Sequence, residues 1–590
     1  MPFYPMVAEQ PTQKITTDTF RGYNHQLKIG DGEFYDQRNI SADEFPLLTN
    51  RKKRGIVREL FTPQGILAKE KLAWVDAGSL FYDGVETPLT GLSFGEKQLI
   101  SMGAYIVVFP DKMYYNTADP SDYGSMEATY NAVRTVSYNR CTITGDSIDV
   151  KFISATEPTN PANGDYWINT SGSVHGLYIY SFGEWESVAT VYTKITFAGS
   201  RGLIPAQFKE LDAVNISGCF YNGGSEYVAK QVSDLNGSKV LYAVGGDADT
   251  DDYIVVIGLL DEVFSQSQVF KMERKVPDLD FVCESQNRLW GCRYGVKDGV
   301  TYNEIKCCAL GDFKNWDRYL GLSTDSYTAS VGSDGAWTGC VNYLGYPTFF
   351  KENVMHRVSI SSVGAHQIIE QAMRGVQTGS HNSLAVVNET LYYKAMDEVC
   401  AYQGGFPVGI SKNLGDVKYK DAVGCVLGDK YYLSMTKGDK RELFVYNTTL
   451  NIWSKEDDLN VIQMARLGTE LYCVADDKLY AMLGSEGKLE DKVKWEATTG
   501  IQYYEVPGNK YVSRYNVRLK MESASYVNVY IEYDSSGEFE LCGQMYINGT
   551  NTVTLPIRPR RCDHMRVKLS GEGNVKIFSI ARVFEMGSDA

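Results

Sequence analysis

Leu391-Tyr392-Tyr393 has three counterparts in this sequence, Phe349-Phe350, Tyr431-Tyr432-Leu433 and Leu471-Tyr472-Cys473, and this repeat indicates the fold. The first residues of these four segments lie 42, 40 and 40 positions apart. Each segment is short and aromatic, and turn residues such as Gly428-Asp429-Lys430 separate it from its neighbours. A repeat of roughly 40–45 residues with several strands in each unit is typical of a β-propeller blade.

Related segments occur earlier in the chain, at residues 79–84 and 111–115. Residues from about 121 to 270 do not follow the 40-residue spacing. The last hundred residues show strict alternation instead, as in Tyr526-Val527-Asn528-Val529-Tyr530, which favours a β-sandwich. We therefore predict an all-β chain, a β-propeller interrupted by an inserted β-rich domain and followed by a C-terminal β-sandwich. The expected parts are an N-terminal arm with the first blade or blades (1–120), the insertion (121–270), the remaining blades (271–490) and the sandwich (491–590).

Composition agrees with this fold class. The chain has 590 residues, of which 43% are apolar and 22% charged, with 41 Tyr and 55 Gly. Many Tyr and Gly without long Ala, Leu, Glu or Lys runs favour strands joined by tight turns. Helical pattern is scarce, and the best candidate is a turn or two at residues 204–211. No stretch of about 18 apolar residues is present, and the N-terminus lacks the pattern of a secretory signal, so we expect no membrane span and no export.

The sequence assembles no recognisable active site. It contains no nucleophile elbow, P-loop or dinucleotide fingerprint, and the six His never combine with Cys at zinc-ligand spacing. His356, His366 and His381 fall in one blade region without sharing a strand face, so we interpret them as isolated surface or core residues. We therefore predict no catalytic, cofactor-binding or metal-binding residue, no cofactor and no enzymatic activity.

Two charged segments call for separate interpretation. Asp247-Ala248-Asp249-Thr250-Asp251-Asp252 places carboxylates at alternate positions, as a calcium loop does, but Asp252 stands where that loop requires Gly, and Gly258 where it requires Glu. A solvated acidic turn is the preferred interpretation, with a calcium site as the alternative. The basic run Arg51-Lys52-Lys53-Arg54 is similarly interpreted as a solvated loop and not as a site for nucleic acid.

Residues 155–188 read as a separable module of two or three short strands within the insertion. Tyr166, Trp167 and Trp185 stand out in it. These three side chains are candidates for an exposed aromatic platform that binds a glycan. They are equally suited to form the core of so small a unit, where Trp must supply much of the buried area, and we prefer that second interpretation.

Three segments resemble the propeller region of phage tail nozzle proteins, also called packaged-DNA stabilization or tail tubular proteins. The segments are Asn315-Trp316-Asp317, the stretch from Val331 through Ser333-Asp334-Gly335-Ala336-Trp337 to Gly339, and the stretch from Phe349 through His356 to Val358. Gly375-Val376-Gln377-Thr378-Gly379-Ser380 continues the pattern, and the 155–188 module is similar to small Gly-Asp-Tyr-Trp units of phage tail proteins. The resemblance covers about 280–410 and includes no catalytic motif.

The resemblance implies a structural virion protein that forms a ring, commonly a hexamer, below the portal and head–tail adaptor of a short-tailed phage. Such a nozzle extends the channel for ejection of double-stranded DNA, helps to retain the packaged genome, and contacts tail fibres or spikes. The implied location is the virion tail, after synthesis in the bacterial cytoplasm. The net charge of −15 suits a conduit to which DNA does not adhere.

Two alternatives stay open. The chain is alternatively a tail-tip or adhesion protein that binds host surface glycan through the 155–188 module. The third candidate is a glycan-degrading propeller enzyme, because propellers are a frequent scaffold for such enzymes and many of them use two carboxylates at a set separation. The 73 acidic residues leave that pair unassigned.

Overall fold

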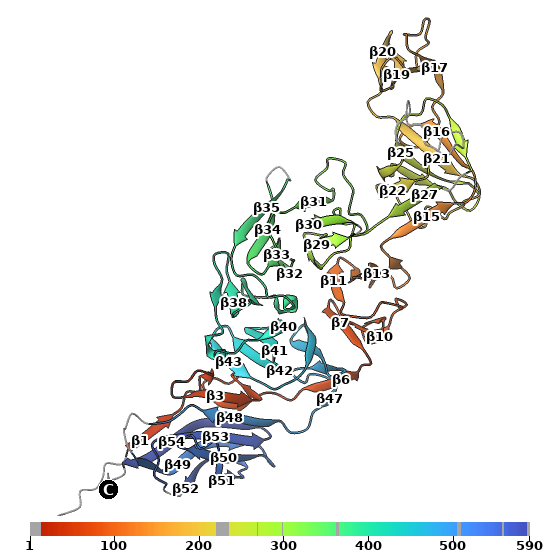
Figure 1. The fold of residues 1–590 in the computed structure, drawn as a ribbon. Helices are drawn as coiled ribbons and strands as arrows, with labels where there is room; N and C mark the ends of the chain where they lie inside the picture. The colour runs from red at the N-terminus through yellow and green to blue at the C-terminus, as the bar shows by residue number, and fades with distance from the viewer. Residues whose placement is uncertain are drawn as a thin grey trace, which may run out of the picture. The chain divides into compact units, whose positions relative to one another are not determined.

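The computed structural model describes residues 13–219, 235–267, 270–297, 299–361, 365–503, 509–556 and 560–586. Nearly every regular element is a strand (Figure 1). The helical elements in these ranges are two single 3-10 turns, η2 (His381–Ser383) and η3 (Lys412–Leu414). The helical turn expected at residues 204–211 is present as a single hydrogen-bonded turn, in which the Phe208 N–H donates to the Ile204 carbonyl at 2.8 Å. Across the same ranges, no helix is long and apolar enough to cross a lipid bilayer.

The chain divides into two compact units. Unit 1 comprises residues 1–99, 333–359 and 368–590, and unit 2 comprises residues 100–332 and 360–367. Unit 1 holds the C-terminal sandwich and several blade sheets, whereas unit 2 holds the inserted domain with its neighbouring blade strands.

Seven blade sheets follow one another along the described chain, and in the first six of them consecutive strands are neighbours. Their strands are β7 (Pro63–Ala68), β8 (Leu72–Asp76), β9 (Ser79–Tyr82) and β10 (Val85–Glu86); β11 (Gln98–Met102), β12 (Tyr105–Phe109), β13 (Met113–Asn116) and β14 (Tyr123–Ser125); β28 (Phe281–Ser285), β29 (Arg288–Lys297), β30 (Val300–Cys307) and β31 (Tyr327–Ser330); β32 (Gly339–Tyr343), β33 (Tyr346–Lys351), β34 (Val354–Ile360) and β35 (His366–Ala372); β36 (Ala385–Val387), β37 (Thr390–Lys394), β38 (Val399–Tyr402) and β39 (Val408–Gly409); β40 (Lys420–Leu427), β41 (Lys430–Lys437), β42 (Lys440–Asn447) and β43 (Ile452–Lys455); and β44 (Val461–Leu467), β45 (Glu470–Ala475) and β46 (Lys478–Ala481), completed by β6 (Gly55–Glu59) and β47 (Lys488–Leu489).

The aromatic repeat coincides with the second strand of its blade sheets. All five residues of β37 and all six of β45 are buried. A second strand is paired on both edges, and neighbouring blades cover both of its faces, so its central residues form a short apolar and aromatic run instead of an alternating pattern. Tyr431 in β41 is fully buried and donates its hydroxyl hydrogen to the Ser383 carbonyl at 2.7 Å. The predicted fold class, a propeller with an inserted β-rich domain and a β-sandwich, is confirmed.

Within unit 1, the last blade sheet takes one strand, β6, from the N-terminal part of the chain, and this strand lies between β46 and β47. β6 pairs with β46 in antiparallel register, from Lys478↔Glu59 to Ala481↔Gly55. The basic run that precedes β6 is not the solvated loop that we expected, because Arg51 and Arg54 are buried. Arg54 binds Glu456 at 2.6 Å and Asp457 at 2.7 Å. These partners follow more than 400 positions later, which explains why the run looks unpaired in the sequence.

The inserted domain of unit 2 packs two sheets face to face. One sheet contains β15 (Ala128–Ala132), β27 (Phe270–Arg274), β22 (Ala213–Ser217) and β23 (Gly237–Val240); the other contains β24 (Ala243–Gly245), β25 (Asp252–Ile257), β21 (Tyr192–Phe197), β16 (Val136–Cys141) and β26 (Phe264–Gln266). Residues of both sheets, among them Ile216, Met272, Tyr138 and Ile254, share one core. The two sheets therefore form a small sandwich.

Asn315 links this insertion to a blade loop of the same unit. Its side-chain amide donates to Asp212 at 2.9 Å and to Asp312 at 2.7 Å, and its carbonyl oxygen accepts the Ala213 N–H at 2.8 Å. Asn315 is fully buried, and Asp212 also binds Arg274 at 2.5 Å. One of the segments that resembles nozzle proteins therefore has a structural role in holding the insertion.

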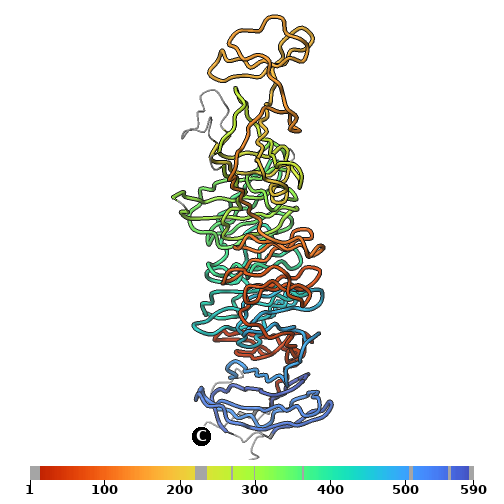
Figure 2. Tube along the Cα trace, turned by 90° about the vertical axis from the view of Figure 1, so that its right-hand side faces the viewer, coloured from red at the N-terminus to blue at the C-terminus, as the bar shows by residue number. Residues whose placement is uncertain are grey.

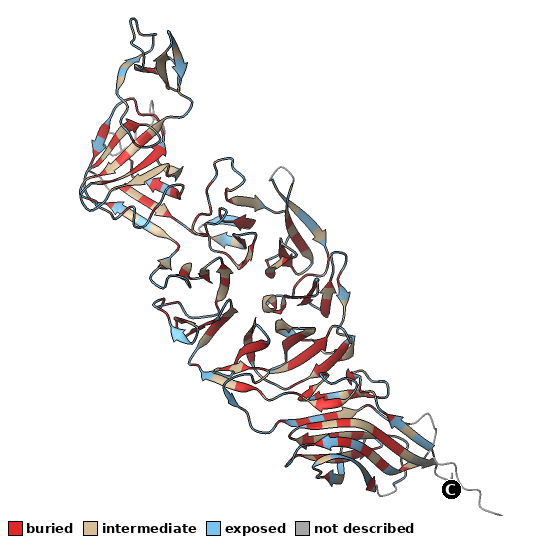
Figure 3. Ribbon diagram, turned by 180° about the vertical axis from the view of Figure 1, so that it is seen from behind, coloured by how far each residue is buried: buried red, intermediate tan, exposed pale blue. Residues whose placement is uncertain are grey.

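The C-terminal sandwich includes strands from both ends of the described chain (Figure 2). One sheet is β4 (Ile40–Ser41), β5 (Leu48–Asn50), β54 (Val575–Met586), β49 (Lys510–Met521) and β52 (Gly549–Pro556), with β1 (Gln13–Thr17) also on β54; the other is β2 (Gly22–Tyr23), β3 (Glu33–Arg38), β48 (Lys494–Thr499), β53 (Met565–Glu572), β50 (Tyr526–Tyr533) and β51 (Glu540–Met545). Figure 3 shows buried positions following these strands, and in β53 they alternate with half-buried ones. Five N-terminal strands thus complete a domain for which only the C-terminal sequence gave a signal.

Candidate functional site

The small module of unit 2 is a four-stranded sheet (Figure 1). Its strands are β17 (Val150–Ser154), β18 (Tyr166–Asn169), β19 (Gly176–Ser181) and β20 (Glu184–Ser187). β17 and β18 are parallel, and the other pairs are antiparallel. The module therefore begins a few residues before the predicted 155–188 range, because β17 supplies one edge of the sheet.

The two faces of this sheet have different neighbours. Ile168 and Leu177 are paired across the strands and fully buried, and they pack against Leu259 of the inserted domain, with Tyr166 at the border of the same cluster. Side chains alternate between faces along a strand. Trp167 and its cross-strand partner Tyr178 therefore lie on the opposite face.

That opposite face is made of aromatic rings, and we call Phe152, Trp167, Tyr178, Tyr180 and Trp185 the aromatic face. The ring centroids of Trp167 lie 5.2 Å from Tyr178 and 5.5 Å from Trp185, and those of Tyr180 and Trp185 lie 5.2 Å apart. The Phe152 ring meets Trp185 edge to face at 6.1 Å. Tilted and edge-to-face ring pairs of this kind stabilise one another beyond the burial of their area.

The two indoles of this face differ in their environment. Trp167 is 5% exposed, and its Nε1–H donates to the Ser154 carbonyl at 3.1 Å and to the Ser154 hydroxyl at 3.0 Å. Trp185 is partly exposed, and its Nε1 atom is buried without an acceptor among the described residues. Trp167 is therefore fixed from within the module, whereas Trp185 keeps an unused donor.

The three residues predicted from the sequence are thus divided. The structure brings Trp167 and Trp185 together and places Tyr166 on the opposite face of the sheet. Sequence reasoning missed Tyr178 and Tyr180, although their spacing of two within a strand is the signal that puts them on one face. A glycan-binding role for Tyr166, Trp167 and Trp185 stays a prediction.

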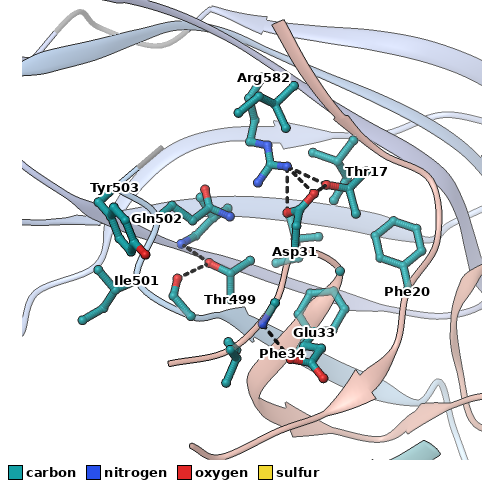
Figure 4. A pocket seen from close by; sticks show the side chains of 18 of the residues that line it. Thr17, Phe20, Asp31, Glu33, Phe34, Thr499, Ile501, Gln502, Tyr503 and Arg582 are labelled. Carbon is teal, nitrogen blue, oxygen red and sulfur yellow. Dashed lines mark hydrogen bonds and ion pairs between the residues drawn. The ribbon is translucent and has the colours of Figure 1, made fainter. Parts of the chain in front are cut away.

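A second candidate site is a cavity of about 400 Å³ within the C-terminal sandwich (Figure 4). Phe20, Phe34 and Tyr515 contribute apolar walls, and Asp31 binds Arg582 at 2.8 Å. Asp31 also accepts a hydrogen bond from the Thr17 hydroxyl. The neighbouring carboxylate accepts the Gly30 N–H at 2.7 Å and the Asn24 amide at 2.9 Å, both through Glu33 Oε2. Each carboxylate is thus already engaged in holding the loop before β3.

His356 is the most enclosed of the three blade histidines. Its ring is fully buried, and its Nε2 atom lies 3.1 Å from the Ser333 hydroxyl and 3.2 Å from a Glu370 oxygen. Burial lowers the pKa of His356, and the nearby Glu370 carboxylate opposes that shift. A Ser-His-acid triad needs the hydroxyl and the carboxylate on different ring nitrogens. Both contact Nε2 here, so this geometry does not activate Ser333.

The acidic turn proves to be two separate structures. Asp247 accepts the N–H groups of Asp249 and Thr250, each at 2.8 Å, and so closes a local turn. Asp252 is fully buried and accepts the Ser200 hydroxyl at 2.7 Å together with the Gly202 N–H at 2.6 Å. Its carboxylate holds a loop. In the described part of the chain, no group of three or more His, Cys, Asp or Glu is arranged to hold a metal ion.

Comparison with known proteins gives structural likeness alone. No family profile and no curated protein matches the sequence. An exo-β-1,3-galactanase from Phanerochaete chrysosporium is 8% identical, with a TM-score of 0.21 over 50% of this chain and 94% of that chain. A family 43 arabinoxylan arabinofuranohydrolase from Bacillus subtilis is 9% identical, with a TM-score of 0.18 over 51% and 94%. The extracellular domain of a hybrid two-component system from B. thetaiotaomicron is 8% identical, with a TM-score of 0.23 over 94% and 95%.

These comparisons correct one prediction. We expected a chain without enzymatic activity, and that prediction is wrong on this finding, because the similar solved structures include glycoside hydrolases. At 8–9% identity the likeness concerns the fold, and the activities of those enzymes belong to those enzymes. None of the similar structures named here is a phage tail protein, so the resemblance to nozzle proteins stays a prediction.

Proposed function

We propose that this chain is a subunit of the tail nozzle of a short-tailed phage, a ring below the portal and adaptor that extends the DNA exit channel and helps to retain the genome. The observation that carries the proposal is the set of residues that resemble nozzle proteins, from Asn315 to Val358. Asn315 holds the inserted domain through Asp212 and Ala213, so the resemblance falls on residues that maintain the interrupted propeller.

Trp337 gives a second case in the same set of residues. It is 4% exposed, and its ring lies 6.0 Å from Phe349 and 5.1 Å from His356. The Lys351 ammonium lies 4.6 Å from the Trp337 ring centroid. All four residues belong to the segments that resemble nozzle proteins, and together they pack the turn before β32 onto its blade. A ring subunit needs such rigid blades, because its contacts with neighbouring copies repeat around a closed symmetry.

Charge supports a role beside DNA without a role in gripping it. The chain carries 73 acidic and 58 basic residues. In its densest basic run, Arg51 and Arg54 form ion pairs with Glu490 and Glu456. A protein that binds the backbone tightly presents clustered Lys and Arg to the phosphates. A net negative conduit repels phosphate and lets the duplex pass.

The assembly of the full-length chain tests this function. The purified chain is mixed with purified portal–adaptor complex and examined by sedimentation and by electron microscopy of negatively stained particles. We expect closed rings, commonly of six copies, on the adaptor end of the complex. A chain that stays monomeric and does not bind the adaptor would refute the nozzle assignment.

The second candidate is a glycan-degrading propeller enzyme, which the family 43 structures bring in through their fold. Its test is the release of reducing ends when the full chain is incubated with host cell-wall or capsule polysaccharide. Release that is lost on heat inactivation would favour this candidate, and no release would remove it. The outcome is independent of ring assembly, so the two candidates are separable.

A further inference from the structure

A cavity of about 500 Å³ in unit 1 lies where the C-terminal sandwich meets the last blade sheet. Its wall is formed by the chain between β4 and β6, the turn between β46 and β47, the end of β49 and the start of β54. Its volume is in the range of pockets that hold small molecules. The side chains around it therefore decide whether it has a ligand and of which kind.

Lysine side chains gather around this cavity. Lys52 and Lys53 belong to the basic run before β6, Lys520 is near the end of β49, and Lys576 is near the start of β54. Lys576 binds Glu44 at 2.6 Å. The ammonium groups of Lys52, Lys53 and Lys520 form no ion pair or hydrogen bond within the described part of the chain.

The acidic side chains of the wall compensate this positive charge only in part. Asp43 is paired with Lys430, which is not part of the wall. Burial tends to raise the pKa of Asp43, but Lys430 and Lys52 lower it, so Asp43 also compensates part of the Lys52 charge. Glu522 accepts a hydrogen bond from the Asn574 amide at 2.9 Å. Among the described residues, no carboxylate of the wall is paired with either of the other two lysines.

Two of the lysines are direct cross-strand neighbours, since Lys520 in β49 is paired with Lys576 in β54. Leu519 and Met521, on either side of Lys520, are buried in the sandwich core, so the Lys520 side chain points away from that core. Like charges directly opposite each other destabilise a sheet, and Glu44 compensates only one of the two. An arrangement that costs stability and also lines a cavity indicates a functional site.

The cavity selects the kind of anion. Ammonium groups are good ligands for phosphate, which they bind as point charges. The uncompensated charges lie on two different segments of the wall, before β6 and on β49, so a suitable anion carries more than one charged group. The cavity has the size of a small-molecule site. Duplex DNA instead needs a long open surface with clustered Lys and Arg.

We infer that this cavity binds a small anion with several phosphate groups, held between the Lys52–Lys53 segment on one side and Lys520 and Lys576 on the other. Because the Lys52–Lys53 segment leads into β6, the bound anion connects a strand of the last blade sheet to the sandwich strands β49 and β54. The site goes beyond the proposed ring and does not depend on it. A ligand that binds only the folded chain raises its thermal stability.

The test uses the full chain with tripolyphosphate as the probe. Binding is followed by calorimetry and by thermal unfolding at physiological ionic strength, where weak surface attraction is screened. Lys520→Gln removes one charge from the cavity and half of the cross-strand repulsion. Lys440→Gln is the matched control, because Lys440 is directly opposite Lys437 in β42 and β41 and does not line the cavity. A duplex oligonucleotide, used in place of tripolyphosphate, tests the other source of phosphate.

We expect tripolyphosphate to bind and to raise the unfolding midpoint. Lys520→Gln should weaken binding about tenfold, the effect of losing one charge-assisted contact. It should also raise the midpoint of the anion-free chain, because the repulsion with Lys576 is gone. Lys440→Gln should raise the anion-free midpoint in the same way but leave binding unchanged.

The inference is overturned if tripolyphosphate does not bind at millimolar concentration, or if Lys520→Gln binds it as tightly as the original chain does. A lower anion-free midpoint for Lys520→Gln would also overturn it, because Lys520 would then support the fold and not a ligand. Tighter binding of the duplex oligonucleotide, with the same dependence on Lys520, would assign the site to nucleic acid instead.

Discussion

A blade sheet and the small module are both four-stranded sheets rich in aromatic residues, but they use those residues differently. In the blade sheet β40–β43, Tyr431 is fully buried and hydrogen-bonded to the chain before the neighbouring β36. In the module, Tyr180 and Trp185 remain partly exposed, and one indole N–H lacks an acceptor. In a sheet with neighbours on both faces, the aromatic side chains are buried in the contacts with those neighbours. A sheet with one covered face keeps part of its aromatic surface in contact with solvent.

The largest loss of stability is expected when the buried aromatic ring of Tyr431 is removed from its blade sheet. Tyr431→Ala removes a fully buried ring and its hydrogen bond, and we expect a loss of about 3–5 kcal/mol in the free energy of unfolding. Tyr180→Ala, its counterpart in the module, should cost only about 1 kcal/mol because its ring already contacts water. Denaturant unfolding of the two variants measures the difference, and equal losses would show that the aromatic face is core after all.

The next largest loss of stability is expected when the ion pairs of Arg54, next to the last blade sheet, are broken. Burial alone would raise the pKa of Asp457, but the adjacent Arg54 and Arg51 guanidiniums lower it. Arg54→Ala leaves Glu456 and Asp457 enclosed without their main partner and should cost about 3–5 kcal/mol, in the manner of a broken buried ion pair. Arg58→Ala in β6, the strand that follows Arg54, is the control, since Arg58 is exposed. Similar thermal unfolding midpoints for both variants would mean that the ion pairs of Arg54 with Glu456 and Asp457 do not stabilise the fold.

Asn315→Ala probes the link to the insertion. The substitution leaves the buried Asp212 carboxylate without one of its donors and the Ala213 N–H without its acceptor. We expect a loss of about 2 kcal/mol, confined to the inserted domain. Amide hydrogen exchange should rise in β22 and β27 while the blade strand β41 keeps its protection. A uniform rise across the chain would mean that the insertion is not a separate cooperative unit.

The smallest expected effect is the loss of stability at acidic pH that comes from protonation of Glu96. Burial tends to raise the pKa of Glu96, but hydrogen bonds from His381, Gln463 and Asn382 outweigh it and lower the pKa from 4.5 to about 2. A depressed folded pKa contributes stability that is fully present above pH 4.5 and disappears as the pH falls toward about 2. Because Glu96 is 44% exposed, solvent screening limits the contribution to about 1 kcal/mol.

Glu96→Gln should therefore be less stable than the original chain at pH 6, and the gap should narrow as the pH falls below 4.5 toward about 2. Glu86→Gln, at an exposed position, should show no such pH dependence. Thermal unfolding across the acid range measures both. A gap that stays constant down to pH 2 would mean that the Glu96 carboxylate is not the titrating group.

The sequence predicts the parts of this structure that depend on local patterning. The aromatic runs mark β33, β37, β41 and β45, because the middle of the second strand of a blade is a run of buried apolar and aromatic residues. Alternation in Tyr526–Tyr533 marks β50 of the sandwich. These features are visible because periodicity is a property of consecutive residues.

What the sequence did not predict depends on partners far along the chain. Arg54 looks solvated until Glu456 and Asp457 are brought to it, and β1 looks like part of an arm until it pairs with β54. The open face of the module is an intermediate case. The spacing of Tyr178 and Tyr180 indicates a shared face, but only the packing of Ile168 and Leu177 on Leu259 shows which face is left uncovered.

Electron microscopy of intact phage particles labelled with an antibody against this chain tests the nozzle assignment directly. The nozzle proposal predicts label on the tail axis, directly below the head. Label on peripheral appendages, or particles without any label, would contradict it.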